Sequence, residues 1–154
     1  MSGSLERRSA EVEETVRRTP DVSLREVFLM AAARLPEEDA RAGVVAEALD
    51  YLQRGFENHY AVRDGATNEE ILVGDNAYAW AVETIACLDE PRFVAVASRM
   101  IRDGAGRIAE GEGVTLDLWT PHLAGLLDVI FGEGQERSEA RIREAEEEAR
   151  YQYG

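Results

Sequence analysis

Large apolar residues recur every three to four positions along most of this chain, which is the spacing of one face of an α-helix. Such faces run through residues 24–35, 45–56, 71–88, 93–108 and 123–130. In the third of these segments, Ala79 and Ala86 fall on the apolar face. No stretch alternates apolar and polar residues for long enough to predict a strand. The pattern therefore predicts an all-α protein, a single-domain bundle of about six to seven helices.

Capping residues and prolines predict where these helices begin. Ser23 to Glu26 has the pattern of a capping box, and so has Thr67 to Glu70. Proline is favoured at the first helical position, because its missing N–H would be unpaired there in any case. Pro36, Pro91 and Pro121 therefore predict the starts of three further helices.

The two ends of the chain differ in composition from the middle. Residues 1–19 have few large apolar side chains and predict a peripheral helix, whereas residues 20–132 predict the main helical domain. Residues 133–154 are dense in glutamate and arginine. They predict a charged C-terminal helix, exposed and supported by pairs such as Glu139–Arg143, or else a frayed tail.

The charge of the chain is strongly negative. It has 31 acidic and 17 basic residues, for a formal net charge of −14, and every basic residue is arginine. Salt screens the repulsion within such a chain, so the composition favours a halophilic source, and specifically a halophilic archaeon. The same charge argues against nucleic acid as a partner, because phosphate backbones are bound by clustered lysine or arginine.

The sequence has no recognisable membrane span, secretory signal or pair of cysteines, and these features bear on the compartment of the protein. No apolar run approaches the roughly 18–20 residues that span a bilayer, and the N-terminal residues are charged where a secretory signal would be apolar. Cys87 is the only cysteine, so no internal disulfide and no cluster of thiolate metal ligands can form. We therefore expect a soluble, cytoplasmic protein.

Residues with catalytic potential are few. His59 and His122 lack the spacing of a zinc site, and each is better interpreted as a structural histidine. The serines in helical segments have no acid–base partner nearby in the sequence, so nucleophilic catalysis has no candidate.

The segment from Asp50 to Asp75 resembles part of the trans-polyprenyl diphosphate synthase family. Aligned on the family's ELLHxxSLxHDDVxD pattern, His59 matches its histidine and Asp64 the last aspartate of its DDxxD motif. Gly74 and Asp75 match the GD that follows. Shorter similarities at Leu24-Arg25 and at 101–113 extend the resemblance over roughly residues 20–132, and imply part of the isoprenoid synthase fold.

The resemblance also implies that the family's catalytic apparatus is lost. Tyr60 and Ala61 occupy the first two positions of DDxxD, and a second aspartate-rich motif is missing from the sequence. The Mg²⁺ site of the family needs several carboxylates, and one aspartate cannot organise it. We therefore expect no cofactor and no independent prenyl transfer, and His59, Tyr60, Ala61, Asp64, Gly74 and Asp75 are interpreted as vestigial motif positions.

Three functional hypotheses remain open. The first is a non-catalytic accessory or regulatory subunit whose partner is a full-length polyprenyl synthase, or a homo-oligomer, with Val82 and Met100 as possible interface residues. The second is an isoprenoid-binding protein without catalysis, which would enclose an apolar pocket. The third is an unrelated helical adaptor.

Overall fold

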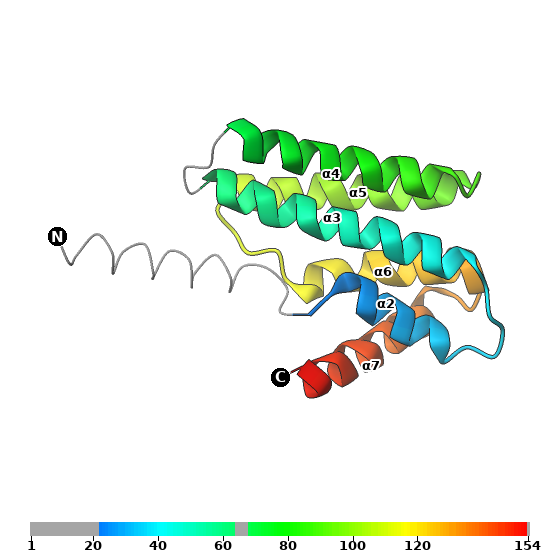
Figure 1. Ribbon diagram of the computed structural model, residues 1–154. Coiled ribbons are helices and arrows are strands. Elements are labelled where there is room, and N and C mark those ends of the chain that lie inside the picture. Colours follow the sequence, from blue (N-terminus) through cyan, green and yellow to red (C-terminus); the bar gives the residue numbers. More distant parts are fainter. Residues whose placement is uncertain (1–21, 64–67, 154) are drawn as a thin grey trace.

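The structure is a computed structural model that describes residues 22–63 and 68–153, and their side chains except those of 59–74 and 152–153. This part of the chain forms six α-helices and contains no strand, which confirms the all-α prediction (Figure 1). The helices are α2 (Leu24–Ala33), α3 (Arg41–Arg63), α4 (Asn68–Ala86), α5 (Pro91–Ala109), α6 (Leu116–Phe131) and α7 (Gln135–Tyr153). The helix predicted for residues 1–19 and the cap predicted at Thr67 lie outside the described residues.

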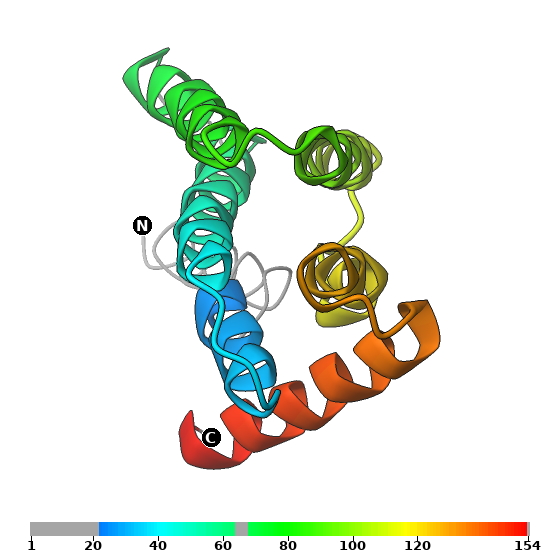
Figure 2. The same ribbon diagram turned by 90° about the vertical axis from the view of Figure 1, so that its right-hand side faces the viewer.

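The helices form two rows that α7 closes at one end. In the end-on view, α4, α3 and α2 follow one another on one side, and α5 and α6 face them on the other (Figure 2). Helix α7 runs across the end of both rows and packs on α6 and α2. The hairpin of α4 and α5 forms the opposite end of the molecule (Figure 2). None of the described helices is long and apolar enough to cross a membrane.

Aromatic rings fill the space between the two rows. Trp119 of α6 is fully buried and stacks on Phe56 of α3, with ring centroids 4.7 Å apart. Gly104 of α5 lies directly against both rings. A Cβ atom at Gly104 would be 2.4 Å from the Phe56 ring and 2.8 Å from the Trp119 ring. Because Gly104 has no side chain, α5 can pack directly against both rings, and α3, α5 and α6 meet at this point.

The start of α2 agrees with the sequence, but the start of α3 does not. Ser23 caps α2, and its hydroxyl oxygen accepts a hydrogen bond from the Glu26 N–H at 3.2 Å. Helix α3 begins at Arg41, so Pro36 is not its first residue. Asp39 supplies the cap instead, because its carboxylate accepts a hydrogen bond from the Arg41 N–H at 2.9 Å and pairs with the Arg41 guanidinium.

Pro91 opens α5 at the predicted position, whereas Pro121 lies inside α6. Helix α6 begins one turn earlier than predicted, at Leu116, and ends at Gly132 in the left-handed conformation. A proline inside a helix costs about 3 kcal/mol. The extra turn buries Leu116 and Trp119, and this burial offsets that cost.

Helix α7 confirms the C-terminal helix predicted within residues 133–154, but it is well packed rather than exposed or frayed. It buries Ser138, Ile142, Ala145 and Ala149 against α6 and α2. Alanine has little apolar surface, so the buried face of α7 is hard to recognise in a sequence segment dominated by charged residues. The predicted Glu139–Arg143 pair is confirmed on the outer side, with an N–O distance of 3.7 Å.

One carboxyl group is buried between α6 and α7. Glu146 is only 7% exposed, and its Oε1 lies 2.6 Å from the hydroxyl of Thr120. The same hydroxyl lies 2.9 Å from the carbonyl oxygen of Leu116, and its single proton can serve one acceptor at a time. A protonated Glu146 could donate to Thr120 while Thr120 donates to Leu116. Burial is the main cause that raises the pKa of Glu146, with a smaller contribution from Asp117.

We expect Glu146→Gln to stabilise the protein at neutral pH. Because the pKa of Glu146 is raised in the folded state, protonated Glu146 stabilises the fold at pH values below the ordinary glutamate pKa. This contribution is lost as the pH rises through the pKa that Glu146 has in the folded protein. The amide of glutamine retains the hydrogen bond without the charge. The increase in the free energy of unfolding of Glu146→Gln over wild type should therefore shrink as pH falls towards about 4.

Urea unfolding from pH 4 to 8 checks this expectation, with Glu147→Gln as the control. Glu147 is exposed on the same helix, and its substitution makes the same change in net charge. Equal effects of the two substitutions would contradict a specific contribution from the buried carboxyl group.

Candidate interaction surface

An exposed aromatic pair joins α3 and α4. The Trp80 side chain is 55% exposed although it is the largest on α4. Its ring stacks against Tyr51 of α3, with centroids 6.4 Å apart and planes inclined by 27°. The guanidinium of Arg54 lies 5.8 Å from the Tyr51 ring centroid, within cation–π range. We call Tyr51, Arg54 and Trp80 the Trp80 surface.

A close contact between α3 and α4 holds this surface in place. Gly55 follows Tyr51 by one helical turn, and a Cβ atom there would lie 2.3 Å from the ring of Tyr78. The two helices can therefore approach closely at Gly55, with Tyr78 directed against Phe56 at a centroid distance of 5.3 Å. Trp80 follows Tyr78 by two positions and lies on a different side of α4.

The surroundings of the Trp80 surface are polar and partly hollow. Asp50 pairs with Arg54 at 3.0 Å, an i,i+4 contact that orients the guanidinium. A hollow of about 340 Å³ adjoins it, lined by Arg25, Gly43, Glu47, Asp50, Tyr51 and Arg54. Trp, Tyr and Arg are the residue types enriched in the energetic centres of protein interfaces. Here all three gather at one place within a polar rim.

The vestigial positions inferred from the family resemblance lie on both arms of the α3–α4 hairpin. His59, Tyr60 and Ala61 are in the last turns of α3, and Gly74 and Asp75 are in α4. Asp64 lies outside the described residues. Of this set only the side chain of Asp75 is described, and it is exposed. The identification of these residues as motif remnants stays a prediction.

The two interface residues proposed from the sequence differ in burial. Met100 is fully buried in the core of α5, so its assignment to an interface is wrong. It lies on the face of α5 that packs inward, with Phe93 and Ala97. Val82 is half-buried.

A second polar contact joins α5 and α6. The Nε2 atom of His122 lies 2.8 Å from Oδ2 of Asp103, and the His122 ring is 6.3 Å from that of Trp119. The interpretation of His122 as a structural histidine agrees with this contact. The Nε1–H group of Trp119 is buried and finds no acceptor within the described part of the chain.

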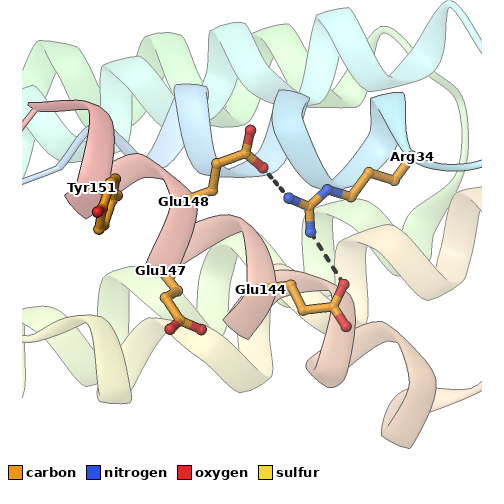
Figure 3. A pocket seen from close by; sticks show the side chains of 5 residues that line it. All are labelled: Arg34, Glu144, Glu147, Glu148 and Tyr151. Atoms are coloured by element: carbon orange, nitrogen blue, oxygen red, sulfur yellow. Dashed lines mark hydrogen bonds and ion pairs between the residues drawn. The ribbon is translucent and has the colours of Figure 1, made fainter.

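A shallow hollow of about 390 Å³ lies between α2 and the end of α7 (Figure 3). Arg34 reaches across it and pairs with Glu144 at 3.1 Å and with Glu148, while Tyr151 lies at its edge. The contact ties α7 to α2, so we interpret it as structural. Among the described residues, no group of histidine, cysteine, aspartate and glutamate side chains is placed to hold a metal ion.

Comparison with protein families, with curated proteins and with solved structures found no match for this chain.

Proposed function

We propose that this chain is an interaction protein that binds another protein through the Trp80 surface. The exposure of Trp80 carries the proposal. The ring keeps more than half of its surface in water while stacking on Tyr51, although burial of a tryptophan is strongly favourable. A partner that covers both rings would remove this apolar area from water.

The surface is also organised before binding. Tyr51 and Trp80 restrict each other by stacking, and the Asp50 pair holds Arg54 beside them. Side chains that are already ordered lose less conformational entropy when a partner binds. An isoprenoid-binding protein would need an apolar pocket in its core, and the space between α3 and α6 is filled by Phe56 and Trp119. This packing favours an interaction protein over an isoprenoid-binding protein.

The resemblance of residues 50–75 to polyprenyl synthases suggests one partner to test first. If the chain is an accessory subunit, a full-length polyprenyl diphosphate synthase from the same cell should bind it. The hairpin that carries this resemblance also carries Tyr51 and Trp80. The identity of this partner follows from the resemblance alone, whereas the position of the surface follows from the structure.

We expect Trp80→Ala to weaken binding to that synthase about 30-fold, equivalent to roughly 2 kcal/mol, as for an energetically central interface residue. Titration calorimetry with the purified proteins measures the effect. Tyr151→Ala is the matched control, because Tyr151 is 92% exposed and lies on α7. Circular dichroism should show both variants folded. Equal affinity of Trp80→Ala and wild type would contradict the assignment of the surface.

A further inference from the structure

Two carboxylates flank the stacked rings of the Trp80 surface. Helices α3 and α4 pack side by side and run in opposite directions (Figure 1). Glu47 precedes Tyr51 by one turn of α3. Glu83 follows Trp80 by one turn of α4. Because the two helices are antiparallel, both steps lead in the same direction along the hairpin. Glu47 and Glu83 therefore lie at the same end of the ring pair, one on each helix.

The negative charge at this end of the rings is not neutralised. Both side chains are exposed, and neither Glu47 nor Glu83 has an ion-pair partner among the described residues. Arg54 lies at the opposite end of the rings, where the i,i+4 pair described above holds it. Arg25 is 3.9 Å from the carboxylate of its own neighbour Glu26. The Trp80 surface thus combines an aromatic centre with two free carboxylates.

A guanidinium group fits this combination. Its planar face can stack on an aromatic ring while its N–H groups pair with carboxylates, and tryptophan is the best aromatic partner for a cation. More than half of the Trp80 side chain is open to such a contact. A neutral side chain would leave Glu47 and Glu83 unpaired. An acidic one would be repelled both by these carboxylates and by a chain whose net charge is −14.

We propose that the partner presents a basic, arginine-containing segment to the Trp80 surface, with a guanidinium stacked on Trp80 and paired with Glu47 or Glu83. The proposal rests on the proposed function, because it names the chemistry of the segment that occupies the same surface. The recognised unit is the segment rather than the whole partner. A short peptide rich in guanidinium groups should therefore bind at this place.

Hexa-arginine is the probe, and hexa-citrulline is its matched control, because citrulline has the shape of arginine without the charge. Fluorescence anisotropy of labelled peptides on the full chain, at about 0.15 M salt, gives the dissociation constants. Hexa-arginine should bind at least about tenfold more tightly than hexa-citrulline. In proton–nitrogen correlation spectra it should shift the indole N–H signal of Trp80. The signal of Trp119, which is fully buried, should stay in place.

Variants distinguish this site from attraction to the net charge. The double variant Glu47→Gln/Glu83→Gln should weaken hexa-arginine binding about tenfold, because two ion pairs are lost. Trp80→Ala should weaken it about fivefold through loss of the cation–π contact. Glu136→Gln/Glu147→Gln is the matched control, since both side chains are exposed on α7 and the change in net charge is the same. It should change the affinity less than about twofold, and circular dichroism should show every variant folded.

Three results would overturn the proposal. Equal losses of affinity in the two double variants would show that hexa-arginine responds only to the net charge of the chain. Full affinity of Trp80→Ala for hexa-arginine would exclude the stacking contact, and equal binding of hexa-arginine and hexa-citrulline would exclude recognition of the charge. If Trp80→Ala still weakens binding of a synthase while hexa-arginine fails these tests, the basic segment is refuted and the proposed function stands. If Trp80→Ala affects neither interaction, both are refuted.

Discussion

Replacing Trp119 with alanine is expected to lower the free energy of unfolding by about 3–5 kcal/mol, the usual cost of removing a large aromatic side chain from a core. The Trp119 side chain is fully buried and stacks on Phe56 from the opposite row of helices. Its removal would leave a cavity where α3, α5 and α6 meet. Urea unfolding followed by circular dichroism measures the loss.

Trp119→Phe distinguishes the contribution of aromatic stacking to stability from that of the indole N–H group. Phenylalanine can retain the stacking on Phe56, and the N–H that it removes has no acceptor within the described part of the chain. Its cost should therefore be less than half that of Trp119→Ala. Equal costs for the two variants would show that the indole N–H has a role that the structure does not reveal.

Gly104→Ala and Gly106→Ala are expected to change stability in opposite directions. Alanine is a better helix former than glycine by up to about 1 kcal/mol, and this gain applies at both sites. At Gly104 the new methyl group would lie 2.4 Å from the Phe56 ring, and such overpacking costs about 1–3 kcal/mol. At Gly106 no atom lies within 4 Å of the new methyl group, so only the gain remains.

The midpoints of urea unfolding for these two variants and wild type provide the measurement. Because both residues lie on α5 and receive the same substitution, helix propensity cannot account for a difference in sign. If Gly104→Ala proved as stable as wild type, the close packing of α5 on the two rings would be wrong.

Helical periodicity predicted the fold class well because each helix buries one apolar face. The faces of α2 and α3 are those expected, and Ser23 caps α2 as the sequence indicates. Helix α4 is the exception. Its buried residues include Ala77, Ala81 and Ile85, whereas Ala79 and Ala86 are exposed. Alanine occurs on every side of this helix, so the apolar pattern does not specify which side packs inward.

Two further errors have a common cause: the burial of side chains in the folded protein outweighed a local sequence signal. The sequence predicted that Pro121 begins a helix. In the structure α6 begins at Leu116 and continues through Pro121, because this extension buries Trp119. The alanines of α7 looked too small to anchor a charged helix, yet Ala145 and Ala149 pack fully against α6 and α2. A capping signal acts over one turn, and it is outweighed when a large side chain further along the segment must be buried.

The Trp80 surface could not be found from the sequence. An aromatic residue in an apolar helix is expected in the core, and Trp80 lies between Ala79 and Ala81. Its pairing with Tyr51 brings together residues 29 positions apart, and so depends on how α4 packs against α3. Sequence did identify the α3–α4 segment as the most informative part of the chain, but through motif positions whose role stays a prediction.

Site-specific photocrosslinking from position 80 tests the central claim most directly. The full chain, with the photoreactive p-benzoylphenylalanine in place of Trp80, is expressed in its own cell type and irradiated, and the cross-linked peptides are identified by mass spectrometry. We expect one defined protein product, identified by its cross-linked peptide. The same probe at Tyr151, which is more exposed, should give no such product. No defined product from position 80, or the same diffuse products from both positions, would contradict an interaction through the Trp80 surface.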